Sequence, residues 1–164
     1  RIVLWDTTLN QLTEGEILFV MAHEMGHYVE KHIYIGIVVY TFTTILGLWL
    51  IAKLMPWIIA RFGSRLKIKQ IHAIHSFPLF LLITSVLSFA SSPLTNYISR
   101  YEETRADDYA IELVEEPSAA VSTFQKLTIA GLNEVNPPLL VKWFRYSHPT
   151  MLERINKVVD DTSE

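Results

Sequence analysis

The sequence has no cysteine among its 164 residues, and only 19% of the residues are charged. The missing cysteines exclude a disulfide framework and any thiolate metal site, so a bound metal must have nitrogen and oxygen ligands. An ordinary soluble domain is about 25% charged, so this chain is unusually apolar. The net charge of −3 gives no reason to expect nucleic acid. Without an initiating Met or a signal-peptide profile, the chain is expected to be part of a longer protein.

Acidic residues are missing from the whole interval between Glu30 and Glu102, which contains two long uncharged stretches. A bilayer core about 30 Å thick is spanned by about 20 apolar residues in a helix. We therefore predict transmembrane helices at 33–55 and 77–98. The alternative is a buried helical hairpin inside a large soluble protein.

A basic segment at 53–69 separates the two predicted spans. Its cations have no compensating acid: Lys53, Arg61, Arg65, Lys67 and Lys69. By the positive-inside rule such a loop lies in the cytoplasm. The rule would then put the segments that flank the hairpin on the other side of the membrane.

Residues 23–27 read His-Glu-Met-Gly-His, the HExxH pattern, within a run that predicts a helix at 14–31. Thr13 and Glu16 match a capping box at its start. At spacing i and i+4 the two imidazoles leave one helix face about one turn apart, where they can share a zinc ion. Glu24 lies beside them and can take a proton from a water that the metal activates. The alternative is an ordinary helix with two surface or core histidines.

A catalytic zinc takes three protein ligands and leaves one position for water. On an unbroken helix His32 lies about 140° around the axis from His27, so it could ligate only if the helix breaks. We expect it to mark the membrane boundary or to contact another group. His72 and His75 follow the basic segment, at the far end of the predicted spans, and are not expected to be ligands.

The segment after the second span offers a carboxylate ligand. If the spans form an antiparallel hairpin, residues 99–107 return to the end that carries the two histidines. Glu103 and Asp107 share one helical face, so Glu103 can ligate zinc while Asp107 accepts from the free ring N–H of a zinc histidine. Glu102 points about 100° away. The alternative is a solvated helix with Glu–Arg pairs.

The remaining segments predict a mainly α fold. Residues 1–6 read as one short strand. The second span is expected to continue into a polar helix at 93–115, and further helices are expected at 117–131, 139–146 and 149–159. We predict a single metallopeptidase domain over residues 1–164, with the two membrane helices inside it.

Several motifs follow one another along the chain: RIVLWDTTL leading into AHEMGH, two apolar spans, SRYEETRADDYA, and YSHPTMLERI. Together they resemble the membrane-embedded zinc metalloendopeptidases of the CAAX prenyl protease 1 and HtpX group. The position of His32 and the final SHPTMLERI are closer to the CAAX prenyl protease 1 branch. The resemblance implies an HExxH zincin-like helical core with a transmembrane hairpin and one Zn²⁺ per chain, in a multi-pass membrane protein.

The resemblance also implies roles for individual residues. His23 and His27 match the two zinc histidines, and Glu24 matches the general base. Glu103 matches the third zinc ligand, which makes the site gluzincin-like. Asp107 matches the aspartate that supports a zinc histidine.

Two C-terminal residues complete the implied site. His148 matches a histidine that supports the tetrahedral intermediate, although by itself it reads as a helix-start residue before Pro149. Arg154 matches an arginine that organises the site near its carboxylates. Its guanidinium can pair in bidentate fashion with Glu103 or a neighbouring carboxylate.

The implied activity is hydrolysis of peptide bonds in a peptide or protein substrate, including CAAX-type processing of lipidated peptides. The resemblance implies a catalytic side that faces the cytoplasm, against the direction that the basic segment favours. Two alternatives stay open: an HtpX-type quality-control protease for membrane proteins, and a zinc-stabilised membrane scaffold without turnover. The sequence does not indicate an oligomeric state.

Overall fold

The computed structural model describes residues 6–114, 116–132 and 134–161. These residues are almost entirely helical and contain no strand, so the mainly α prediction is confirmed for them. The strand predicted at 1–6 lies outside the described residues, except for Asp6, which begins a helix.

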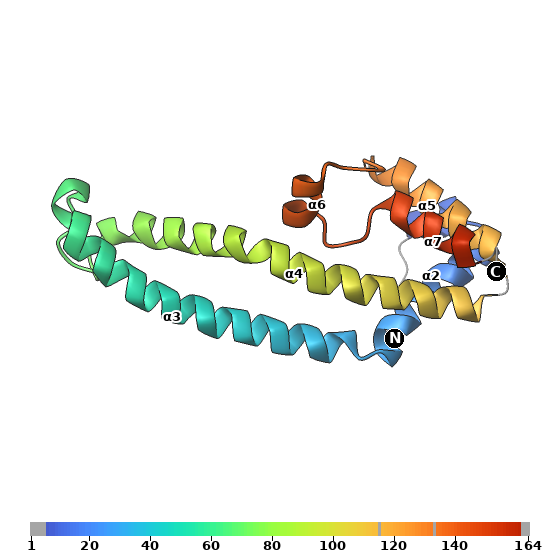
Figure 1. The fold of residues 1–164 in the computed structure, drawn as a ribbon, viewed down its shortest axis with the longest axis horizontal. Coiled ribbons are helices and arrows are strands. Elements are labelled where there is room, and N and C mark those ends of the chain that lie inside the picture. The colour runs from blue at the N-terminus through green and yellow to red at the C-terminus, as the bar shows by residue number, and fades with distance from the viewer. Residues whose placement is uncertain (1–5, 115, 133, 162–164) are drawn as a thin grey trace. The chain divides into compact units, whose positions relative to one another are not determined.

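Seven α-helices and one short 3-10 turn follow one another along the described chain (Figure 1). They are α1 (Asp6–Gln11), α2 (Glu14–Val29), α3 (His32–Leu66), η1 (Ile74–Ser76), α4 (Phe77–Leu113), α5 (Pro117–Gly131), α6 (Leu139–Arg145) and α7 (Met151–Asp161). Helix α1 was not predicted, because six residues are too few to show an apolar period. The chain forms two compact units: unit 1 comprises Arg1–Tyr34 and Pro93–Glu164, and unit 2 comprises Ile35–Ser92.

The predicted capping box at the start of α2 is confirmed. The backbone N–H of Thr13 donates to Oε2 of Glu16 at 2.6 Å. Glu16 is buried and also accepts from Lys126 Nζ and Ser122 Oγ, each at 2.7 Å. The residue that caps α2 therefore also holds α5 against it.

The core of unit 1 lies where α2, α4, α5 and α7 meet. Its buried residues are Phe19, Ala22, Ala110, Ala120, Phe124 and Val158. The rings of Phe19 and Phe124 meet edge to face, with centroids 5.4 Å apart, an arrangement that adds stability beyond the buried area. This core fixes α2 against α5 and places the HExxH helix beside the second half of α4.

Unit 2 is a helical hairpin, in which α3 packs against Ile68 of the connecting segment and against the first part of α4 (Figure 1). Its buried cluster is Met55, Ile68, Leu79 and Ile83. The helices His32–Leu66 and Ile74–Leu113 are both long and apolar enough to cross a membrane, and their most apolar windows are only 0% and 6% buried. Such outward-facing apolar surface is unlike the core hairpin of a soluble protein, which would be covered.

Both long helices extend beyond the predicted spans. Helix α3 continues through Pro56 to Leu66, and α4 continues through Pro93 to Leu113. The predicted continuation of the second span into the polar helix is therefore confirmed. Each internal proline lacks the N–H of one backbone hydrogen bond, yet both helices continue past it.

Candidate metal centre

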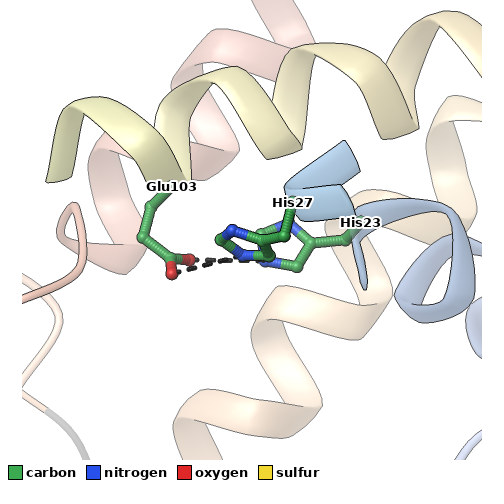
Figure 2. A group of neighbouring side chains, drawn as sticks. All are labelled: His23, His27 and Glu103. Atoms are coloured by element: carbon green, nitrogen blue, oxygen red, sulfur yellow. Dashed lines mark hydrogen bonds and ion pairs between the residues drawn. The ribbon is translucent and has the colours of Figure 1, made fainter. Parts of the chain in front are cut away.

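Three side chains from two helices converge in unit 1: His23 and His27 from α2, and Glu103 from α4 (Figure 2). Nε2 of His23 lies 3.3 Å from Oε2 of Glu103, and Nε2 of His27 lies 3.5 Å from Oε1. The two imidazole Nε2 atoms are 3.1 Å apart. One ligand atom from each residue falls within 4.8 Å of the others, a spacing at which all three can reach one metal ion.

The local chemistry fits a divalent metal. Oε2 of Glu103 is buried, and its one close partner among the described residues is Nε2 of His23 at 3.3 Å, which does not form a well-aligned hydrogen bond with it. Such a poorly satisfied acceptor is costly unless a cation satisfies it. The Nε2 atoms of His23 and His27 also face each other. Two imidazole nitrogens at this distance need a proton or a metal ion between them. Two imidazoles and one carboxylate form one of the ligand sets used by catalytic zinc.

Gly26 explains how α4 comes close enough to bring Glu103 to the histidines. A Cβ atom at this position would lie 3.0 Å from Cα and 3.1 Å from the carbonyl oxygen of Ala106. Ala106 is itself completely buried. The glycine, which costs roughly 1 kcal/mol in a helix interior, is therefore required by the close approach of the two helices beside the site.

Asp107 joins His23 to Arg154 behind the metal-facing atoms. Its Oδ1 lies 2.9 Å from Nδ1 of His23. Arg154 Nε donates to Oδ2 of Asp107 at 2.7 Å, and Nη2 donates to Oδ1. The guanidinium lies over the ring of Phe124, 4.2 Å from its centroid. The sequence left open whether Arg154 pairs with Glu103 or with a neighbouring carboxylate. In the structure it pairs with the neighbouring carboxylate, Asp107.

The electrostatics differ between the two histidines. Burial acts to lower the pKa of His23, but hydrogen bonds to Asp107 and Glu103 raise it to about 9. The pKa of His27 is lowered, by burial and by the charge of His23. In the metal-free site His23 is therefore the imidazole that carries the extra proton at neutral pH.

The raised pKa of His23 predicts a pH-dependent metal affinity. The proton on His23 favours the metal-free folded state; this stabilisation is complete below pH 6.5 and is lost as the pH rises through about 9. A metal must displace that proton, so its apparent affinity is expected to rise about tenfold per pH unit from 6.5 to 9 and then level off. Chelator competition at several pH values measures this slope. In Asp107→Asn the zinc affinity should stop rising at a lower pH. A wild-type affinity that does not change between pH 7 and 9 would contradict the prediction.

The other residues named from the sequence also lie in unit 1. Nε2 of His148 is 3.4 Å from Oε1 of Glu103, and its Nδ1 is 2.9 Å from Oγ of Ser147. His148 is on the loop between α6 and α7, which Arg100 holds by donating to the carbonyl oxygen of Tyr146 at 2.6 Å. Glu24 is exposed on α2, directly after His23.

The alternative ligands lie elsewhere. His72 and His75 belong to unit 2, and Glu102 is not part of the cluster that could hold a metal. His32 does contact another group, because the helix breaks before it: its Nδ1 lies 2.9 Å from Nδ1 of His27. The sequence predicted separate helices at 14–31 and 33–55, but it did not predict the turn at Lys31 that brings the two rings together.

Comparison with known proteins assigns the chain to a protein family. The model of Peptidase family M48 matches residues 1–162. The chain belongs to Peptidase family M48. The resemblance stated from the motifs is therefore confirmed at the level of the family.

Individual M48 relatives agree with this assignment. The chain is 52% identical over 155 residues to metalloprotease YhfN of Bacillus subtilis, covering 94% of the chain and 36% of that protein. It is 30% identical over 178 residues to CAAX prenyl protease 1 of Saccharomyces cerevisiae, covering 100% of the chain and 39% of that protein. The chain thus spans little more than a third of the relatives it matches.

A solved structure shares the fold. The crystal structure of S. mikatae Ste24p superposes with a TM-score of 0.72 at 31% sequence identity, over 96% of this chain and 38% of that one. The mainly α fold of this chain is therefore shared with that part of Ste24p.

Proposed function

We propose that this chain carries the active site of a zinc-dependent endopeptidase embedded in a membrane. The convergence of His23, His27 and the buried carboxylate of Glu103 is the observation that carries the proposal. Membership in Peptidase family M48 supports a metal-dependent protease. We also propose residues 1–164 as one metallopeptidase domain into which the helical hairpin is inserted.

The residues around the cluster have distinct roles in this proposal. A bound zinc ion would act as a Lewis acid and lower the pKa of a water to about 7. Glu24, exposed beside the ligands, accepts the proton of the attacking water and returns it to the leaving amine. His148, at the exposed edge of the cluster, donates a hydrogen bond to the oxygen on which negative charge develops.

Asp107 and Arg154 act through other residues. Asp107 accepts from Nδ1–H of His23, which leaves the Nε2 lone pair of that ring free for the metal. Arg154 fixes both oxygens of Asp107. Because a planar guanidinium pairs with a carboxylate through two parallel bonds, it sets the orientation of that carboxylate as well as its charge.

The proposal also covers the membrane in which the protein lies and the class of its substrate. Helix α3 has 35 residues, about 50 Å of helix, against a hydrocarbon core of about 30 Å, so its basic last turns extend past the core. We propose a multi-pass membrane protein whose substrate is a peptide, with lipidated CAAX-type peptides favoured by the similarity to CAAX prenyl protease 1. Protease accessibility of residues 61–75 in sealed vesicles decides between a cytoplasmic active site and the orientation that the basic segment favours.

The proposal is tested by metal analysis and peptide cleavage on the same purified protein. We expect about one zinc per chain, and cleavage that a chelator stops and added zinc restores. A lipidated CAAX peptide compared with an unfolded membrane protein separates CAAX processing from HtpX-type quality control. A zinc-loaded protein that cuts neither substrate would instead favour the membrane scaffold.

The third ligand gives a prediction of its own. Glu103→Gln should keep the shape of the side chain but lose the negative charge, and zinc affinity should fall by more than about 100-fold, the upper range for residues that only support a ligand. Glu102→Gln, the adjacent residue outside the cluster, is the matched control and should retain zinc. Chelator competition measures both, and the opposite ranking of the two variants would move the ligand role to Glu102.

A further inference from the structure

We propose that His32 positions the second metal histidine, by accepting a hydrogen bond from Nδ1–H of His27. The inference rests on the proposed function, because it assumes that His27 binds a metal through Nε2. It assigns a role to a buried residue that is neither a ligand nor in contact with the reacting atoms.

The contact between the two rings is specific. Nδ1 of His27 and Nδ1 of His32 are 2.9 Å apart, and the rings meet edge to face with centroids separated by 5.0 Å. His32 is only 5% exposed, so water does not compete freely for its ring. At this distance one nitrogen must carry a hydrogen and the other must accept it.

The direction of this hydrogen bond follows from the rest of the site. Nε2 of His27 faces His23 and Glu103, and a nitrogen that ligates a metal cannot carry a proton. The proton of neutral His27 is therefore on Nδ1, which donates to Nδ1 of His32. His32 must then carry its own proton on Nε2. The second ring thus selects the ligating tautomer of the first, as Asp107 does for His23.

The backbone is built to make this contact. Helix α2 ends at Val29, and Lys31 adopts a left-handed conformation with φ of 59°. On a continuous helix His32 would lie about 140° around the axis from His27, where its ring could not meet that of His27. The left-handed residue turns the chain back, at a cost of roughly 1–2 kcal/mol for a residue with a Cβ. A left-handed residue also follows α3 at Lys67 and ends α5 at Leu132, as at many helix ends; at Lys31 this turn brings the next ring onto His27.

The same turn is anchored to the helix that supplies Glu103. Arg105 of α4 donates to Oε2 of Glu30 through Nε at 3.0 Å and through Nη2 at 2.7 Å. The pair is partly exposed, so its role here is geometric. It fixes the residue before the left-handed turn to the element that carries the third ligand, which keeps His32 in register with His27.

The two metal histidines therefore have different partners. His23 has the carboxylate of Asp107, whereas His27 has a neutral imidazole. A carboxylate makes its histidine a more basic ligand and adds negative charge, and a neutral acceptor orients the ring without adding charge. A metal bound here would have two oriented histidine ligands, and only one of them would have a charged partner.

Two variants separate hydrogen bonding from packing. His32→Asn keeps an acceptor, because its side-chain oxygen occupies nearly the position of the imidazole Nδ1. His32→Leu fills similar space but offers no acceptor. We expect the leucine variant to bind zinc about 10–100-fold more weakly than wild type, as for other partners of metal histidines, and the asparagine variant to regain most of that loss. His75→Leu, an exposed histidine of unit 2, is the control and should bind zinc as wild type does.

The measurement is zinc affinity by chelator competition on the full purified protein at one pH, together with thermal unfolding of each metal-free variant. Wild-type affinity in His32→Leu, or equal losses in the leucine and asparagine variants, would overturn the proposal. Cleavage by wild type is assayed in parallel. Zinc binding without cleavage would remove the proposed hydrolysis but leave the His32 comparison valid, whereas a wild type that holds no zinc would overturn both.

Discussion

Replacing Glu24 by Gln is expected to remove peptide hydrolysis and leave the metal in place. Glu24 is exposed beside His23 and lies outside the group of side chains that could hold a metal. An amide at this position cannot take a proton from the attacking water, and general acid–base catalysis contributes about 10²–10⁴-fold. We therefore expect kcat/KM to fall by a factor in that range, with unchanged zinc content and an unchanged unfolding temperature.

Glu14→Gln is the matched control for this experiment. Glu14 is also an exposed glutamate of α2, in its first turn, so the substitution makes the same chemical change away from the cluster. Its activity should equal that of wild type. Full activity in Glu24→Gln would exclude Glu24 as the base, and a loss of zinc from that variant would show that the carboxylate holds the metal rather than a proton.

Much of the site could be predicted because its determinants are local. The spacing of His23 and His27 places both rings on one helix face, and that of Glu103 and Asp107 does the same on another helix. The capping residues Thr13 and Glu16 indicate where the first of these helices begins. Patterns that repeat every three or four residues are set by helix geometry alone, so they can be read without knowledge of the fold.

The contacts that the sequence left open are those between distant segments. Arg154 could pair with either of two carboxylates, and only the packing of α7 against α5, with Phe124 under the guanidinium, selects Asp107. His32 depends on a left-handed Lys31, a conformation that lysine does not favour by itself. Both outcomes depend on how separate segments meet, and no local pattern carries that information.

Replacing Arg154 is expected to have the largest effect on stability. Arg154 and Asp107 are 8% and 3% exposed, and the arginine contributes both charge and two hydrogen bonds. Arg154→Met leaves protonated His23 as the cation shared by the buried carboxylates of Asp107 and Glu103, so one negative charge is uncompensated, and breaking a buried pair in this way typically costs about 3–5 kcal/mol. The metal-free protein should unfold at a clearly lower temperature, and zinc should bind more weakly because Asp107 no longer holds His23 in one orientation.

Two further variants test this explanation. Arg154→Lys keeps the positive charge but not the planar fork, so it should recover part of the stability and less of the zinc affinity. The double variant Arg154→Met with Asp107→Asn removes the uncompensated charge, and should therefore be more stable than Arg154→Met alone while still binding zinc weakly. That divergence distinguishes the two roles of the pair: stability depends on charge balance, and metal affinity depends on an oriented acceptor at Nδ1 of His23. If the double variant were the less stable of the two, packing of Arg154 against Phe124 would account for its effect instead of the ion pair.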